Sequence, residues 1–548
     1  MIKFFIRESL RGIKFNTIYL LFRVIRPSID MVCYLLFPAL VNNEHSFNKY
    51  HEKKESIFRL ILLVFFLIIS STLSSQEVNS SGRGKKTEII EREIPSLMKQ
   101  FSIPGLSLAV IRDGQIDYVK SFGVKNINGK EPVNNSTVFA AASLTKPVFS
   151  YLVLKLHDEG KIDIDTPLYK YIPVKYLEKY FIKGPVTEAG FDFEEFKKIT
   201  GRLVLCHSTG LPVYQASRPL KFDFPPGTEF RYSPFSFRLL ELAVYCIQGS
   251  DKKHFFKTDL NVWIKKYVFE PLGMKRSSMI WCKEFKKTTV AGHDLFNTTS
   301  GEFVKNRYAG SQASLYTTAE DYARFIIAVM KGEGLKEKTA AEMLKTQINM
   351  KEENNFWGLG VGLEKADQGF YFWQWGDYGL HKAFMIGSSD LQDGLVYFSN
   401  SYYGLCPADD IIQLILGGEH PVFLNSIMGS YTDAIKKWVH LFCIEGVDKG
   451  LRDYSIQKLV NPNPVSEILL LAIGDEFLKN KRYSDAAAVY NLAVTDYPTS
   501  YKAFYKLGAS HMLAGNKELA IKNFEKSLQI NPKNKIAGEN LRKLKEEK

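Results

Sequence analysis

The sequence lacks the patterns that mark metal and nucleotide sites. Its six cysteines are scattered and form no Cys-x-x-Cys pair, so a cysteine-held zinc site is not expected. It also lacks a His-Glu-x-x-His motif, a P-loop, and a Gly-x-Gly-x-x-Gly turn before a helix. We therefore expect neither a metal nor a cofactor. The cysteines fit buried free thiols or disulfides, and sequence alone does not pair them.

A continuous basic stretch is also missing from the main body of the chain. The net charge is +13, but residues 1–59 contribute +5 and residues 501–548 contribute +6, which leaves +2 for everything between them. This distribution argues against a nucleic-acid partner. Apolar residues make up 45% and charged residues 24% of the 548 residues, which is typical of a folded chain with more than one domain.

Long apolar runs are scarce, and the clearest one is near the N-terminus. Residues 60–69 are uniformly apolar, with basic residues before them and small polar residues after them, as in a secretory signal. Residues 18–40 are interrupted by charges and are not expected to span a membrane. If both segments did cross, the main body would lie on the inner side. We expect an extracytoplasmic protein, periplasmic or secreted, with a basic N-terminal extension (1–59), a signal peptide or membrane anchor (60–75) and a polar linker (76–88).

Local turn and cap signals predict the elements of the main body. Strands are expected at residues 106–111, from 115 to Phe122, at 382–387 and at 394–400, with a hairpin turn at Arg112–Gln115. Helices are expected at residues 88–101, from Ser143 to Glu159, at 318–331 with a threonine cap, and at 407–417. Strands at both ends with helices between them favour an α+β fold, in which helices flank an antiparallel sheet.

A Ser-x-x-Lys pattern at Ser143 and Lys146 is the first candidate for chemistry. On a helix, positions three apart share one face, so the amine can hold the hydroxyl and accept its proton. Serine is a weak nucleophile that needs such an adjacent base. A helix N-terminus adds backbone N–H groups that favour a developing anion. The pattern alone is common, so the neighbouring segments must show whether this occurrence is catalytic.

Five ordered segments form the context of this pattern: Ala141–Ile172, Ile199–Pro212, Pro226–Ser233, Ala319–Phe325 and Phe356–Gly360. Together they resemble the serine β-lactamase-related family, which includes class C β-lactamases, D-alanyl-D-alanine carboxypeptidases and related esterases. The resemblance covers about residues 90–420, and Ser-x-x-Lys is a known nucleophile motif of penicillin-recognising enzymes. It implies a β-lactamase/transpeptidase-like fold with an added helical domain, and a serine hydrolase in which Tyr232 joins Ser143 and Lys146.

By the same resemblance, Tyr232 shuttles a proton between serine and leaving group. Because a phenol ordinarily ionises near pH 10, we expect the cation of Lys146 to lower its pKa. Two departures concern substrate binding: Pro234 stands where many members have asparagine, and neither lysine nor histidine opens the third motif. We assign that motif to Trp375-Gly376-Asp377, with the N–H after it, that of Tyr378, completing the oxyanion hole with Ser143. Trp375 then favours an apolar or sugar-like group.

The C-terminal part repeats itself with a period of 34 residues, and residues 467–500 align with 501–534. Small residues, aromatic residues and proline recur at matching places, as in tetratricopeptide repeats. Two repeats with a capping helix near 537–545 therefore follow the main domain. The expected boundaries are a hydrolase-like domain (89–430), a connecting helix and linker (431–462) and the repeat module (463–548).

Two functions remain open. The first is a serine hydrolase of the penicillin-binding type that forms an acyl-enzyme on an ester or amide, such as a small molecule or a D-amino-acid peptide. The second is a catalytically weakened scaffold that binds a protein partner through residues 463–548. Pro234 and the altered third motif favour the second, and the Ser143, Lys146 and Tyr232 set favours the first.

Overall fold

The computed structural model describes residues 83–546 except 215–218, 251–254, 258, 300–304, 425–432 and 463. The expected extension (1–59) and the signal or anchor segment (60–75) lie outside the described residues. None of the described helices is both long enough and apolar enough to cross a membrane. Helix α4 (Arg83–Gln100) begins within the expected linker (76–88), so the linker prediction is wrong from Arg83 onward. Lysine, threonine and glutamate residues extend the helix backward from its apolar positions, since they tolerate helical conformation.

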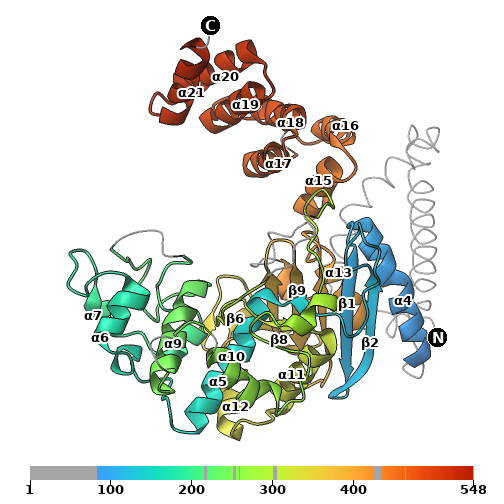
Figure 1. Cartoon of the computed structure of the whole chain (residues 1–548). Helices are drawn as coiled ribbons and strands as arrows, with labels where there is room; N and C mark the ends of the chain where they lie inside the picture. Colours follow the sequence, from blue (N-terminus) through green and yellow to red (C-terminus); the bar gives the residue numbers. More distant parts are fainter. Residues whose placement is uncertain are drawn as a thin grey trace, which may run out of the picture. The chain divides into compact units, whose positions relative to one another are not determined.

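An antiparallel sheet forms the centre of the main domain (Figure 1). In the described part of the chain it has eight strands, in the order β2-β1-β10-β9-β8-β7-β6-β5. This sheet confirms the expected α+β class. The strand bounds are β1 (Gly105–Arg112), β2 (Gln115–Gly123), β5 (Ile348–Asn349), β6 (Asn355–Trp357), β7 (Gly362–Ala366), β8 (Gly369–Asp377), β9 (Lys382–Gly387) and β10 (Gly394–Ser399), with a separate pair of β3 (Phe139–Ala140) and β4 (Tyr316–Thr317).

The first hairpin of the sheet has the predicted turn. Arg112 pairs with Gln115, and the two turn residues, Asp113 and Gly114, have φ values of 51° and 65°. Two successive positive φ values match the right-handed twist of the strands, and aspartate followed by glycine supplies them at low cost. The paired strands β9 and β10 confirm the second strand prediction.

Helices cover both faces of the sheet, because strands such as β1 carry apolar side chains on both faces. The side chains of β1 alternate: Ala109 and Ile111 belong to the core on one face, and Leu106, Leu108 and Val110 belong to the core on the other. Both sets are fully buried, so the strand reads as a continuous apolar run. Helix α11 (Ala319–Lys331) packs against β1, β2 and β10 on the first face. The apolar side chains of α4 and α13 (Ala408–Ile415) join the second core.

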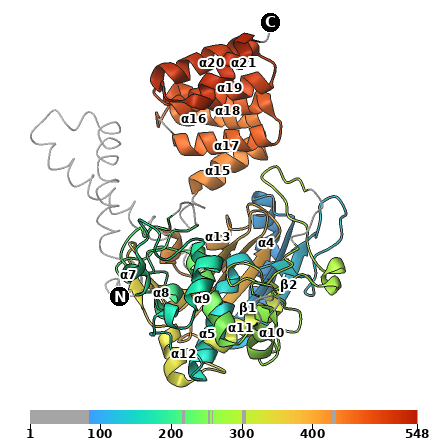
Figure 2. The ribbon, with the colours of Figure 1, turned by 60° about the vertical axis from the view of Figure 1, so that its left-hand side comes forward.

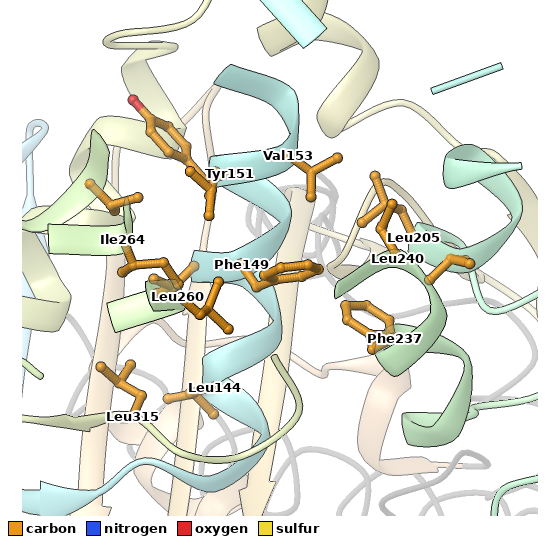
Figure 3. Close-up of a cluster of buried hydrophobic side chains, with 14 of the residues drawn as sticks. Leu144, Phe149, Tyr151, Val153, Leu205, Phe237, Leu240, Leu260, Ile264 and Leu315 are labelled. Atoms are coloured by element: carbon orange, nitrogen blue, oxygen red, sulfur yellow. The ribbon is translucent and has the colours of Figure 1, made fainter. Parts of the chain in front are cut away.

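Helix α5 (Thr145–Asp158) is the central helix of the first face. Figure 3 shows it between Leu260 and Ile264 of α10 on one side and Phe237 and Leu240 of α9 on the other. Phe149 lies in the same buried cluster. Because α5 is buried along most of its length, the turn that precedes it is held in place by the core.

Helix α11 (Ala319–Lys331) shows the cap signals that bound it at both ends. Thr318 caps α11 by accepting from the N–H of Asp321, as predicted, and Gly332 ends that helix with a φ of 65°. The bounds are α6 (Val174–Tyr176), α7 (Phe193–Phe196), α8 (Gly201–Leu205), α9 (Pro234–Ile247), α10 (Asp259–Ile264), α11 (Ala319–Lys331), α12 (Glu337–Met343), α13 (Ala408–Ile415) and α14 (Pro421–Leu424), with shorter turns η2 (Ala142–Leu144), η3 (Leu168–Lys170), η4 (Leu177–Ile182), η5 (Lys265–Phe269) and η6 (Lys283–Lys287).

The C-terminal part consists of packed helices that lie side by side (Figure 2). The predicted small-to-aromatic packing is confirmed, since Gly474 lies against the ring of Tyr490 and Gly508 lies against the ring of Phe524. A glycine at these places lets the two helices of each unit approach closely. The bounds are α15 (Asp433–Cys443), α16 (Val447–Lys458), α17 (Glu467–Lys479), α18 (Tyr483–Asp496), α19 (Tyr501–Leu513), α20 (Lys517–Ile530) and α21 (Lys535–Glu546).

Candidate active site

Ser143 lies in the short turn η2, directly before α5. Its neighbour Ala142 has a φ of 49°, which places a non-glycine residue in the left-handed region. The side-chain hydroxyl of Thr145 donates to the carbonyl of Ala142 over 2.6 Å, and the N–H of Ala141 donates to the carbonyl of Leu315 over 2.8 Å. These bonds hold a strained turn that presents the serine at the start of a buried helix.

Lys146 is buried beside that serine, with 1% of its surface exposed. Its Nζ lies 2.9 Å from Ser143 Oγ and 2.9 Å from the carbonyl oxygen of Gln312. Burial lowers the pKa of the amine to about 7, because the charged form loses its hydration. A substantial fraction of Lys146 is therefore neutral near pH 7, and a neutral amine can accept a proton from serine.

Tyr232 approaches the same point from the start of α9. Ser233 caps that helix, and its own N–H donates to Nδ1 of His207 over 3.1 Å. The rings of His207 and Tyr232 lie 4.3 Å apart between centroids, so the histidine acts as scaffold for the tyrosine. Lys146 Nζ is 5.0 Å from the centre of the Tyr232 ring. The structure thus brings the alcohol, the amine and the phenol together.

The electrostatic expectation for Tyr232 was wrong. Burial raises the pKa of its phenol above the ordinary value, and hydrogen bonds with Ser143 and Gln374 offset this only in part. The cation of Lys146 does not lower it, because burial makes that amine lose its proton instead. Tyr232 is therefore a proton donor near neutral pH, and Lys146 is the group suited to act as base.

The third motif is shifted by one residue from its predicted position. Gln374 is fully buried, and its amide nitrogen lies 3.1 Å from Tyr232 Oη and 3.2 Å from the carbonyl oxygen of Ser143. Since a carbonyl only accepts, the group facing Ser143 is the NH₂ of the amide. The motif that faces the serine is thus Gln374-Trp375-Gly376. Alternation along the strand decides this, because residues 374 and 376 share one face.

The other expected third-motif residues lie beside this face. Trp375 is partly exposed and its ring is 4.6 Å from that of Tyr232. Asp377 forms an ion pair of 2.6 Å with Lys382, on the neighbouring strand. The N–H of Tyr378 donates to the carbonyl of His381 over 2.9 Å, so it closes the β8–β9 connection. The expectation that this N–H completes the oxyanion hole is therefore wrong.

The bond from the N–H of Tyr378 to His381 also fixes the direction of the preceding N–H group on β8. In an antiparallel ladder, alternate residues bond to one neighbouring strand, so the N–H of Asp377 points away from β9. Gly376 lies so close to the serine turn that a Cβ atom there would be 2.5 Å from the carbonyl oxygen of Ala141. Strand β8 can approach the turn only because this position is a glycine.

Two residues of the site were not found from the sequence. The sequence does not single out Gln374, because two tryptophans flank it and the third motif of the family usually begins with lysine or histidine. Gln312 contributes only its backbone carbonyl, which any residue carries, so no side-chain pattern indicates it. Both become evident only when the strand and the loop meet α5.

Comparison with known proteins shows which family this chain resembles. The beta-lactamase family profile matches residues 90–417, and the tetratricopeptide repeat profile matches residues 501–534. Protein flp of Staphylococcus aureus (strain N315) is 24% identical over 259 residues, which cover 43% of this chain and 47% of that protein. A beta-lactamase of Pseudomonas fluorescens is 29% identical over 153 residues, covering 27% of this chain and 40% of that one. The chain therefore spans less than half of the length of these relatives.

A solved structure described as the crystal structure of SurE has a TM-score of 0.50 and 19% identity, and the match covers 61% of this chain and 78% of that one. At this identity the likeness concerns the fold. The family profile covers more than half of the 548 residues and includes Ser143, Lys146, Tyr232 and Gln374. The chain thus belongs to the beta-lactamase family and carries a tetratricopeptide repeat at its C-terminus.

Proposed function

We propose that this protein is a serine hydrolase that forms an acyl-enzyme at Ser143 on an ester or amide substrate. The observation that carries the proposal is the contact of 2.9 Å between Nζ of the buried Lys146 and Oγ of Ser143. The amine there has a pKa of about 7, so it can take up the serine proton at neutral pH.

Each step of the proposed reaction uses a group of this site. Neutral Lys146 takes the hydroxyl proton while Ser143 Oγ bonds to the substrate carbonyl carbon. The N–H groups of Ser143 and Asp377 face the resulting oxyanion. The proton passes from Lys146 through Tyr232 to the leaving group as the old ester or amide bond breaks. Water then attacks the acyl-enzyme, gives its proton back along the same groups and releases the acid.

Gln374 orients the phenol in this scheme. Its amide donates to Tyr232 Oη, which leaves the phenolic O–H to face Ser143. Its Oε1 is buried and has no hydrogen-bond partner among the described residues. A neutral amide at this place does not provide the cation that a substrate carboxylate would require. We therefore favour neutral esters over β-lactams and peptides with a free carboxylate.

A scaffolding role is the second candidate, favoured by the repeat module and by Pro234. Proline stands at the start of α9, where a backbone N–H has no intrahelical partner, so it benefits the helix and removes a substrate-binding amide. In that case Ser143→Ala would leave the biological phenotype unchanged, and deletion of residues 463–548 would abolish it.

Labelling with a fluorophosphonate tests the hydrolase proposal. The wild-type protein should be labelled, Ser143→Ala and Lys146→Ala should not, and Ser121→Ala on strand β2 serves as the matched serine control. Labelled Ser143→Ala, or an unlabelled wild-type protein, would contradict the proposal. A panel of p-nitrophenyl esters, nitrocefin and D-amino-acid peptides then identifies the substrate class.

A further inference from the structure

Glu241 is a buried carboxylate that the proposed reaction does not use. It lies on α9, the helix that begins directly after Tyr232, and only 1% of its surface is exposed. Its Oε2 accepts hydrogen bonds from the N–H of Ser311 over 2.9 Å and from the hydroxyl of Ser311 over 2.8 Å. Both bonds lead to one residue of the loop before β4.

The residue after Ser311 is part of the active site. The carbonyl oxygen of Gln312 accepts from Lys146 Nζ over 2.9 Å. Further along the loop, the N–H of Leu315 donates to Thr145 Oγ1 over 3.0 Å. The loop is thus bound to α9 at one end and to the start of α5 at the other, with the lysine contact between them.

Removing a carboxylate from water costs free energy, and the two hydrogen bonds from Ser311 offset part of that cost. Oε1 of Glu241 has no hydrogen-bond partner among the described residues, and burial raises the pKa of the carboxyl. The hydrogen bonds from Ser311 and the charge of Arg238 act in the opposite direction. The two bonds to Ser311 are therefore the main interaction that the carboxylate makes in this place.

We propose that Glu241 is a positioning residue that fixes Ser311, so that the carbonyl of Gln312 holds Lys146 against Ser143. The inference rests on the proposed hydrolase function, and it adds a link between the helix that carries the phenol and the loop that orients the amine. Without that link, the loop relaxes and water reaches the amine. The neutral fraction of Lys146 then falls, because a hydrated amine keeps its proton to higher pH.

Other titratable groups near Lys146 and Glu241 are a second possible cause of a change in the pKa of Lys146. Tyr232 and His207 are titratable groups beside Lys146, and burial lowers the pKa of His207, so that imidazole stays neutral. Arg238 and Tyr245, on the same helix, are those that interact with Glu241. Neither set changes in the variants below.

Two readouts on the full chain test the proposal. The first is the rate of fluorophosphonate labelling as a function of pH, and the second is the titration of Lys146 followed by its ¹³Cε signal, assigned with Lys146→Arg. In Glu241→Ala we expect both midpoints to move upward by about one pH unit or more, and labelling at pH 7 to fall about fivefold or more. Glu241→Gln keeps an acceptor for Ser311 and should restore most of the rate and the wild-type midpoint.

Further variants keep the test decisive. Ser311→Ala removes one of the two bonds and should give a smaller shift in the same direction, even where Glu241→Ala fails to fold. Glu364→Gln alters another buried carboxylate, bonded to His420 and to the N–H of Val422, and should lower stability without moving either midpoint.

Wild-type midpoints in both Glu241→Ala and Ser311→Ala, or in Ser311→Ala alone where the first does not fold, would overturn the inference. An unlabelled wild-type protein overturns the hydrolase proposal instead. In that case the ¹³C titration still decides whether Glu241 controls the environment of Lys146.

Discussion

At the scale of single residues, burial assigns the roles of the amine and the phenol. The pKa of Lys146 falls to about 7, whereas the pKa of Tyr232 rises. Both shifts have the same cause, which is that a buried group avoids its charged form. A lysine with an ordinary pKa would be protonated at neutral pH and unable to act as base, so this burial is what makes the pair chemically useful.

This yields a prediction about pH. Labelling of Ser143 should be slow below the pKa of Lys146, rise with pH as the amine loses its proton, and reach half of its maximum near pH 7. The rate should then stay on a plateau, because the raised pKa of Tyr232 keeps the phenol protonated. The measurement is the labelling rate from about pH 5 to about pH 9. A flat profile over this range would contradict the assignment of Lys146 as base.

The Ser-x-x-Lys spacing indicates Ser143 and Lys146 as candidates, and the resemblance to the serine β-lactamase-related family is needed to select that pattern and to add Tyr232. They did not suffice for the third motif. There the choice between Gln374 and Trp375 depends on which face of a strand meets the serine, and a shift of one residue exchanges the faces. The pKa of Tyr232 was also misjudged, because sequence does not show how far a phenol is buried.

At the scale of elements, the close approach of β8 to the serine turn depends on Gly376. We expect Gly376→Ala to push the strand and the turn apart, since its Cβ would lie 2.5 Å from the Ala141 carbonyl oxygen and 3.2 Å from Ala142 Cβ. Displacement of reacting groups by about 1 Å can cost about 100-fold in rate, so labelling should fall by about 10- to 100-fold. Gly129→Ala, where an added Cβ meets nothing within 4 Å, is the control. Unchanged labelling in Gly376→Ala would show that β8 does not position the turn.

Elements with local signals were predicted well, and those that depend on distant partners were not. The hairpin of β1 and β2 and the capped helix α11 follow from a few neighbouring residues. The strands β5 to β8 were not predicted as a unit. They pair in sequence order, but their apolar and aromatic residues carry no regular alternation by which a strand could be recognised before its neighbours are known.

At the scale of the whole molecule, the candidate active site and the repeats lie in different stretches of the chain. Gly508→Ala should destabilise the repeats by about 1–3 kcal/mol, because the added methyl group overlaps the Phe524 ring, 2.8 Å from the Cβ position. Gly538→Ala on α21, where nothing lies within 4 Å, should be neutral or stabilising. Calorimetry measures both effects, and labelling of Ser143 should be unchanged in both variants. A loss of labelling in Gly508→Ala would show that the repeats support the catalytic domain.

The left-handed backbone of Ala142 sets a limit on engineering this molecule. Glycine would adopt its φ of 49° without strain, so a search for thermostable variants would favour replacement there. Yet a glycine there would also loosen the backbone that presents Ser143, the nucleophile of the proposed hydrolase. Heat resistance and the proposed activity therefore make opposite demands at this position, and a stabilisation programme should seek its gains elsewhere in the fold.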